Sequence, residues 1–193
     1  MEKKDFKILV VDDDDMVREF VSSVLIKQGY SVISARDGFD GLRMLLMVED
    51  IKLVITDLKM PGASGMDILE YTQKNNPDIA VVILTGFGTI EDALEAVTKG
   101  AFDYLTKPFK VEEIVFVAEK AFKREIIVCE NRELKRILRD TYRDIGTVRD
   151  IINSNDAGVV SRWMDRMNRL KAMNVLTESE IKVLREKIVK TNA

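Results

Sequence analysis

The stretch Lys7-Ile8-Leu9-Val10-Val11-Asp12-Asp13-Asp14-Asp15 is an apolar run that ends abruptly in four aspartates. The unbroken, β-branched character of Lys7–Val11 predicts a strand buried on both faces. An amphipathic helical pattern follows over Met16–Gln28, and Gly29 closes it. A buried strand that leads directly into a helix is the repeating unit of a parallel α/β sheet.

The same alternation continues outward to residue 110. Further strands are predicted at Ser31–Ala35, Leu53–Thr56, Ala80–Leu84 and Tyr104–Leu105. Helices are predicted over Gly38–Val48, Gly65–Lys74 and Ile90–Lys99, and a longer helix opens at Lys110. Strands separated by helical crossovers predict a doubly wound α/β fold, with helices on both faces of a parallel sheet.

Polar residues follow four of these strands at the point where each strand ends. Parallel sheets bind their ligands beyond the carboxyl ends of the strands, where the strand order reverses. The groups expected to converge there are Asp12 with Asp13, Asp57, Thr85 and Lys107. Each has an ordinary interpretation when taken alone: a solvated loop, a turn residue, a strand-end cap or a surface lysine. Their joint placement at one edge favours a functional site.

Phosphoryl transfer to a carboxylate would use every group in this set. Such a reaction needs a nucleophilic oxygen, a divalent cation and donors for the developing charge. Asp57 can supply the nucleophile, Lys107 a fixed positive charge, and Thr85 a short hydroxyl, while Gly86 leaves room for the incoming group. Three carboxylates about 5 Å apart repel by roughly 3 kcal/mol per pair at an effective dielectric of 20, so a hard cation such as Mg²⁺ is expected among them.

Composition excludes several other classes of chemistry. The chain has 193 residues, enough for one domain and a smaller appendage, and it contains no histidine. Serine–histidine catalysis, zinc–histidine sites and a phosphohistidine donor role are therefore excluded. Cys129 is the single cysteine, so no intrachain disulfide can form. No stretch approaches the roughly 20 apolar residues of a membrane span, and a cytoplasmic location is expected.

Four segments of the sequence stand out at the ends of the predicted strands. They are Ile8-Leu9-Val10-Val11-Asp12-Asp13-Asp14, Asp57-Leu58-Lys59-Met60-Pro61-Gly62, Ile83-Leu84-Thr85-Gly86 and Gly100-Ala101-Phe102-Asp103-Tyr104-Leu105-Thr106-Lys107-Pro108-Phe109. In order and spacing they resemble the receiver domain of two-component response regulators over residues 6 to about 122, most closely receivers of the nitrogen-regulator type.

The resemblance implies a sheet with strand order 2-1-3-4-5 and phosphorylation of Asp57 by a partner histidine kinase. It implies Mg²⁺ held by Asp13, Asp57 and the backbone carbonyl of Lys59, with Asp12 acting through water. Lys107 would contact the phosphoryl group, and the Lys107–Pro108 bond would be cis. Such a protein is a switch whose only reactions are its own phosphorylation and dephosphorylation, not an enzyme.

The resemblance also assigns a switch pair. On phosphorylation, Thr85 would move toward the phosphoryl oxygens and Tyr104 would turn inward into the vacated space. The face made by the fourth helix, fifth strand and fifth helix would then change shape. A homodimer is expected through that face or through the extended last helix.

The C-terminal third is predicted to be a small all-helical region. The helical pattern continues from Val111 to about Leu138, and Gly146 is expected to break it. Three short helices are predicted after it, at Thr147–Asn153, Val159–Met173 and Glu178–Val189. The organisation expected is a receiver domain over 1–122, a helical linker or coiled coil over 123–145, and an output or oligomerisation region over 146–193.

Three outputs compete for this region. It could dimerise or dock a protein partner in response to Asp57. It could instead bind DNA, with phosphate contacts from one helix carrying Arg162, Arg166, Arg169 and Lys171, although these could equally be a solvated face. An aspartyl-nucleophile phosphatase is the third class, but it would need an acid two residues after Asp57, where Lys59 stands. The protein-interaction output is favoured.

Overall fold

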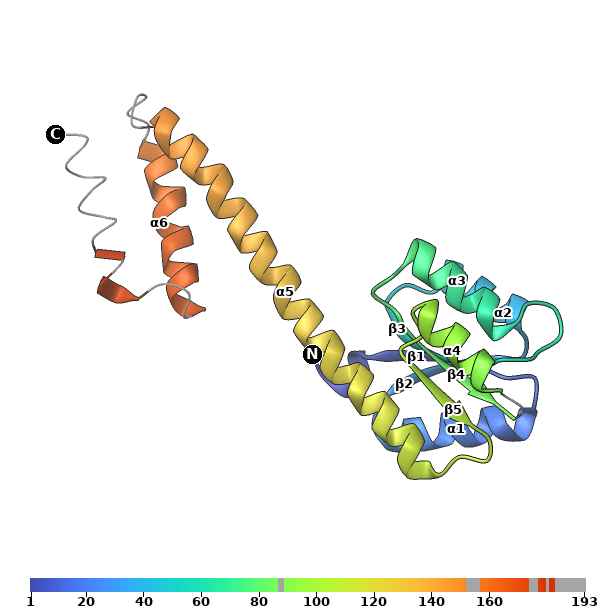
Figure 1. Cartoon of the computed structure of the whole chain (residues 1–193). Helices are drawn as coiled ribbons and strands as arrows, with labels where there is room; N and C mark the ends of the chain where they lie inside the picture. The colour runs from blue at the N-terminus through green and yellow to red at the C-terminus, as the bar shows by residue number, and fades with distance from the viewer. Residues whose placement is uncertain (87–88, 152–156, 174–176, 180, 183–193) are drawn as a thin grey trace. The chain divides into compact units, whose positions relative to one another are not determined.

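A five-stranded parallel sheet forms the centre of the first part of the chain in the computed structural model (Figure 1). The structure describes residues 1–86, 89–151, 157–173, 177–179 and 181–182. The sheet order is β2-β1-β3-β4-β5, which confirms the predicted order. The strands are β1 (Lys7–Val11), β2 (Ser31–Ala35), β3 (Ile51–Asp57), β4 (Ala80–Thr85) and β5 (Asp103–Thr106).

Helices connect the strands in chain order. A short 3₁₀ helix, η1 (Lys3–Asp5), precedes the sheet. The α-helices are α1 (Asp15–Lys27), α2 (Gly38–Met47), α3 (Gly65–Asn75), α4 (Ile90–Thr98), α5 (Val111–Ile151) and α6 (Ala157–Ala172).

Each face of the sheet carries its own apolar core, because successive side chains of a strand point to opposite faces. Ile8 and Val10 of β1 pack with residues of α1 and of the first turns of α5, including Ile114. Leu9 and Val11 pack on the other face with Ile68 of α3 and with residues of α2. This arrangement explains the unbroken apolar run in the sequence, since both faces of β1 are covered.

Polar caps fix where the helices begin. The Asp14 side chain accepts hydrogen bonds from the backbone N–H groups of Met16 and Val17 and caps α1. Ser64 and Asp67 form a reciprocal capping box at the start of α3. Such caps satisfy backbone donors that the first helical turn leaves without partners. Asp14 is therefore used in starting α1.

The chain forms two compact units, Met1–Glu130 and Asn131–Ala193. In the second unit, α5 continues through Gly146 to Ile151, so the predicted break at Gly146 and the separate helix at Thr147–Asn153 are wrong. A single glycine costs a helix only about 1 kcal/mol relative to alanine, which is too little to end it.

The remaining predicted helices have different outcomes. Helix α6 spans Ala157–Ala172, close to the predicted Val159–Met173. The predicted Glu178–Val189 helix lies largely outside the described residues, which are helical at 178–179 and 181–182. None of the described helices is both long enough and apolar enough to cross a lipid bilayer.

Candidate phosphoryl-acceptor site

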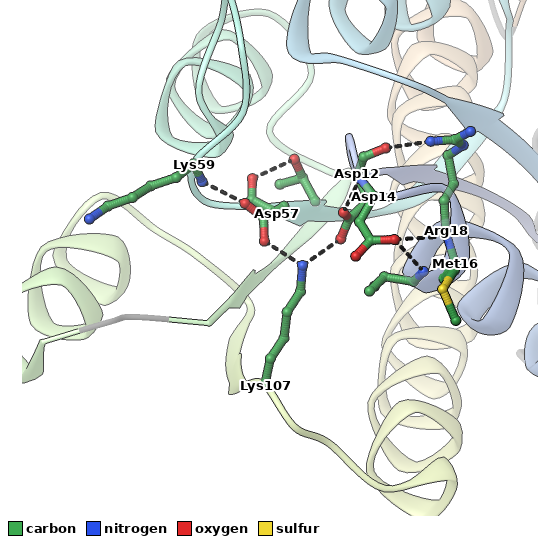
Figure 2. A network of polar contacts seen from close by, with 9 residues as sticks. Asp12, Asp14, Met16, Arg18, Asp57, Lys59 and Lys107 are labelled. Carbon is green, nitrogen blue, oxygen red and sulfur yellow. Dashed lines mark hydrogen bonds and ion pairs between the residues drawn. The ribbon is translucent and has the colours of Figure 1, made fainter.

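The carboxyl edge of the sheet brings four predicted site residues together. Parallel pairing aligns Val11 with Thr56, Asp57 with Leu84, and Thr85 with Thr106, so β1, β3, β4 and β5 end side by side. Asp12 and Asp57 consequently face Lys107, which follows β5. Figure 2 shows the Lys107 side chain reaching up between the two carboxylates. Its Nζ donates to Asp12 Oδ2 at 2.7 Å and to Asp57 Oδ1 at 2.6 Å.

Backbone groups hold Asp57 in position. Its side chain is largely buried, and Oδ2 accepts a hydrogen bond from the Lys59 N–H at 2.7 Å. The turn after β3 passes close to α3, where a Cβ added to Gly65 would lie 2.3 Å from the carbonyl oxygen of Asp57. Only a residue without a side chain fits there. Gly65 therefore lets α3 start directly against the acceptor residue.

Asp12 is the most buried acid of the site, with a relative exposure of 0%. Its Oδ1 accepts a hydrogen bond from the Asp14 N–H at 2.9 Å. The guanidinium of Arg18 donates to the backbone carbonyl of Asp12 at 2.8 Å (Figure 2). The same guanidinium also pairs with Asp15. Sequence reasoning missed Arg18, because a single arginine on a helix has no pattern that distinguishes it from a surface residue.

Burial and charge act in opposite directions on these groups. Burial raises the pKa of Asp12, although the Lys107 ammonium and the Asp14 N–H both lower it. Burial lowers the pKa of Lys107, but the hydrogen bonds and charges of Asp12 and Asp57 outweigh it and leave that pKa above its ordinary value. Lys107 is therefore a permanent cation at neutral pH, and its charge partly neutralises two crowded carboxylates.

Thr85 and Tyr104 lie on neighbouring strands beside this cluster. Thr85 is buried, and its carbonyl accepts a hydrogen bond from the Lys107 N–H at 2.6 Å. The Tyr104 hydroxyl is buried and has no hydrogen-bond partner of normal geometry. Burial raises the pKa of Tyr104, which the nearby Thr85 hydroxyl lowers somewhat. The tyrosine hydroxyl thus points inward in this structure. The Lys107–Pro108 peptide bond is cis.

The chemistry of the donor set fits a hard divalent cation. Asp12 and Asp57 offer carboxylate oxygens at the carboxyl edge, and Asp13 is an exposed acid beside them. Mg²⁺ prefers a few carboxylates together with waters and phosphate oxygens. Across the part of the chain that the structure describes, no three acidic side chains gather closely enough to hold a metal on their own. Lys107 occupies the position between Asp12 and Asp57.

A shallow apolar groove of about 560 Å³ adjoins the site and shares Lys107 with it. Its other lining residues are Met16, Val17, Phe20, Pro108 and Phe109. The rings of Phe20 and Phe109 stack with centroids 6.3 Å apart. Phe20 shares the apolar face of α1 with Val17 by helical spacing, yet it is 43% exposed. Helical spacing alone could not separate the sheet-facing residues from those lining this groove.

Comparison with known proteins gives the same assignment. A family model described as "Response regulator receiver domain" matches residues 8–119, which is more than half of the chain. The chain belongs to the response-regulator receiver family. Receivers of this family are phosphoryl-accepting switches rather than ordinary enzymes, and they act in two-component signalling.

Individual relatives point to nitrogen-regulator-type receivers. The nitrogen assimilation regulatory protein NtrX of Azorhizobium caulinodans is 33% identical over 132 residues, which are 67% of this chain and 29% of NtrX. The transcriptional regulatory protein GlrR of Escherichia coli is 36% identical over 132 residues, 68% of this chain and 30% of GlrR. The chain thus spans less than a third of the length of these relatives.

A solved structure supports the receiver fold. The beryllofluoride-activated NtrC4 receiver domain dimer has a TM-score of 0.57 and 29% identity, and the match covers 61% of this chain and 96% of that one. The similarity therefore concerns the receiver and leaves most of the second unit to be interpreted from its own residues.

Proposed function

We propose that Asp57 accepts a phosphoryl group from the phosphohistidine of a sensor histidine kinase in the cytoplasm. An Asp57 carboxylate oxygen attacks phosphorus, the phosphorus–nitrogen bond breaks, and the histidine nitrogen leaves with the bond's electron pair. The product is an acyl phosphate on Asp57. The observation that carries this proposal is the bridge of Lys107 between Asp12 and Asp57, at 2.7 and 2.6 Å.

The residues around Asp57 would share the work of the transfer. Asp13, Asp57 and the backbone carbonyl of Lys59 would hold Mg²⁺, with Asp12 acting through water, and the bound ion supplies charge neutralisation for the phosphoryl oxygens. Lys107 would contact one phosphoryl oxygen and keep its charge throughout, since its pKa is raised. The Lys59 N–H, which donates to Asp57 Oδ2, keeps the carboxylate oriented. Hydrolysis of the acyl phosphate would return the chain to its starting state.

The signal would leave the site through Thr85 and Tyr104. The Thr85 hydroxyl would turn toward a phosphoryl oxygen, and the half-buried Tyr104 ring, whose hydroxyl is buried, would be held in its inward position. Leu94 and Val97 make α4 apolar and exposed next to β5. The NtrC4 receiver is a dimer in its activated form, which supports homodimerisation of this chain through the α4–β5–α5 face or the extended α5.

The C-terminal helices would then dimerise or dock a protein. DNA binding is the second candidate, because GlrR is named a transcriptional regulatory protein. Two of the four basic residues considered for DNA binding contact other residues of the chain. Lys171 pairs with Glu178 at 2.6 Å, and Arg169 lines a groove between α5 and α6. The side chains of Arg162 and Arg166 lie outside the described residues. A mobility shift with random duplex DNA at low salt would favour the second candidate, and its absence would exclude it.

The proposal is tested by phosphoryl incorporation from radiolabelled acetyl phosphate with Mg²⁺. Wild-type protein is expected to take up label that hydroxylamine releases, as an acyl phosphate requires. Asp57→Asn should take up none. Asp50→Asn is the matched control, because Asp50 is an exposed acid with φ +64°, a conformation that asparagine also adopts. Equal labelling of wild type and Asp57→Asn would refute the assignment.

A further inference from the structure

Arg18 lies one turn into α1 and reaches back over the start of the helix. Side chains of an α-helix lean toward its amino end, so Arg18 can contact residues that precede α1. Its Nη1 donates to the backbone carbonyl of Asp12 at 2.8 Å (Figure 2). Its Nη2 pairs with the carboxylate of Asp15. The Arg18 side chain is only 16% exposed, so a largely buried guanidinium lies against the loop that carries the acids of the site.

Starting α1 does not explain this arginine. The Asp14 side chain already accepts hydrogen bonds from the N–H groups of Met16 and Val17, which caps the helix. The amino end of a helix also carries a partial positive charge, so a cation there is disfavoured. Natural proteins keep such local conflicts mainly at functional sites. The contacts of Arg18 therefore need an explanation beyond the helix itself.

The contact with Asp12 completes the hydrogen bonding of a fully buried acid. The Asp12 N–H donates to the carbonyl of Ala35 in β2 at 3.3 Å. Its two carboxylate oxygens accept from the Asp14 N–H and from Lys107. Within the part of the chain that the structure describes, Arg18 is the one donor to the remaining group, the backbone carbonyl. Asp12 is 0% exposed, so water does not satisfy this carbonyl, and Arg18 fixes its direction.

The direction of the Asp12 carbonyl determines how Asp13 is presented. A peptide group is planar, so this carbonyl lies in one plane with the N–H and the Cα of Asp13. Asp13 is exposed, and across the described residues its side chain makes no hydrogen bond or ion pair. Its own contacts therefore do not hold the carboxylate in place. The peptide plane that Arg18 fixes sets the position from which the side chain extends.

We propose that Arg18 is a positioning residue for Mg²⁺ binding, acting through Asp13 without touching the ion. The inference rests on the Mg²⁺ ligands of the proposed function. The planar guanidinium suits this role because it donates to the Asp12 carbonyl and to the Asp15 carboxylate at once, which fixes its own plane. Groups that orient the direct ligands of a metal commonly account for about tenfold or more of its affinity.

Positioning and simple electrostatics predict opposite effects for the loss of this arginine. A cation close to the site repels Mg²⁺, so removal of the charge alone would tighten Mg²⁺ binding. Removal of a positioning contact would weaken Mg²⁺ binding, because Asp13 would no longer be held in the orientation that binds the ion. The sign of the change therefore decides between the two explanations.

The first test measures the Mg²⁺ dissociation constant of the full chain, from backbone amide resonances during a magnesium titration at constant ionic strength. Arg18→Met is expected to raise this constant about tenfold. Arg18→Lys keeps the charge and a single donor group, so it should raise the constant about threefold, and it provides the measurement if Arg18→Met does not fold. Lys27→Met is the control: it removes an exposed cation from the far end of the same helix and should leave the constant within about twofold. An unchanged or lower constant in the Arg18 variants would overturn the proposal.

A double-mutant cycle tests whether Arg18 acts through Asp13. Asp13→Asn alone should weaken Mg²⁺ binding, because it removes a carboxylate from the ion. In that background, Arg18→Met should raise the dissociation constant by less than about twofold, since the residue that it positions no longer binds. A further loss of about tenfold would show that the arginine acts by another route and would refute the proposed role.

Motion of the Mg²⁺-free chain gives a direct readout of positioning. The backbone order parameter of Asp13, from nitrogen relaxation, should fall in Arg18→Met and stay at its wild-type value in Lys27→Met. The order parameters of β1 should not change in either variant, because its apolar side chains are held in the two cores. An unchanged order parameter at Asp13 in Arg18→Met would contradict the proposal.

Phosphoryl labelling from acetyl phosphate separates this inference from the proposed function. Arg18→Met should need about tenfold more Mg²⁺ to reach half of its maximal labelling rate, while the rate at saturating Mg²⁺ should stay within about threefold of wild type. A fall in the saturated rate with an unchanged Mg²⁺ requirement would refute positioning and assign Arg18 a general structural role. Unchanged Mg²⁺ affinity in Arg18→Met, with normal labelling of the wild type, would refute the inference and leave the proposed function standing. A wild type that takes up no label, but whose Mg²⁺ affinity depends on Arg18, would do the reverse.

Discussion

The two units of this chain differ in how their residues are held. In the first unit, strands far apart in sequence pair with one another, and apolar cores cover both faces of the sheet. In the described residues of the second unit, the buried apolar side chains are Met167, Leu170 and Ile181. A parallel sheet forces the residues after its strands to one edge, whereas a helix pair fixes only the stripe between its helices.

Because of this difference, the two units offer different kinds of evidence about their functions. Convergence at one edge turns Asp12, Asp57 and Lys107 into a site with defined distances. The helices α5 and α6 instead present several surfaces, and only their chemistry distinguishes a packing face from a partner face. The function of the receiver is therefore inferred from the geometry of its site. The function of the second unit is inferred from its charges and its exposed apolar residues.

Separating the chain into its two units should show the largest difference, because one fragment is expected to fold on its own and the other is not. Residues 1–130 alone should unfold cooperatively in urea and still incorporate phosphoryl groups, because both cores and the acceptor site lie within them. Residues 131–193 alone should show little helix by circular dichroism at micromolar concentration, since short helices without enough buried surface are marginal. Cooperative unfolding of 131–193 would show that the second unit is an independent domain.

Removing the Lys107 cation should have the next largest effect. Lys107→Met leaves Asp12 and Asp57 facing each other without their cation, and the free energy of unfolding in urea at pH 8 should fall by about 3 kcal/mol. Lys110→Met, at an exposed lysine three residues on, is the control and should cost less than about 0.5 kcal/mol.

The loss of unfolding free energy in Lys107→Met should become smaller as the pH falls. A raised lysine pKa contributes stability below the ordinary value of 10.5 and loses it only as pH rises through the folded-state value, so the lysine's own charge is constant from pH 5 to 9. The Asp12 pKa is raised by burial and would rise further without Lys107. Protonation relieves the repulsion, so the deficit should shrink between pH 8 and pH 5. A deficit that grows toward pH 5 would contradict this account.

Glycine-to-alanine changes should have a smaller effect, with opposite signs in the two units. Gly65→Ala should destabilise the receiver by about 2 kcal/mol, because its methyl group would meet the Asp57 carbonyl oxygen. Gly146→Ala should stabilise α5 by up to about 1 kcal/mol, because alanine favours a helix. Urea titration of the full chain measures both. Gly86→Ala, with nothing within 4 Å of its added Cβ, serves as the steric control. A loss in Gly86→Ala as large as in Gly65→Ala would contradict the steric explanation.

The sequence predicted the sheet well because its signals are local and strong. The strands at Lys7–Val11 and Ser31–Ala35 have the predicted ends, and the others differ by one or two residues. The predicted convergence of Asp12, Asp57 and Lys107 follows from strand direction alone. By contrast, the break at Gly146 was wrong, since the position of one glycine carries less weight than the surrounding helical residues.

Other features depended on contacts that no local pattern encodes. The bridge that Lys107 forms between Asp12 and Asp57 depends on the position of the segment after β5, which the spacing of residues does not give. The hydrogen bond from Arg18 to the Asp12 carbonyl depends on how α1 turns after β1. The contact of Phe20 with Phe109 joins two segments that are far apart in the sequence. Each requires the packed fold, not the spacing of residues.

Glu125 has a consequence for how α5 leaves the receiver. This carboxylate is only 2% exposed and pairs with Lys52, at the start of β3, at 3.0 Å. Rotating α5 about its axis by the angle of one residue would move the Glu125 carboxylate away from Lys52. The carboxylate would then be buried without the cation that offsets its desolvation. The pair therefore sets the rotational phase of α5, and with it the direction in which Ile127, two residues further on, meets the solvent.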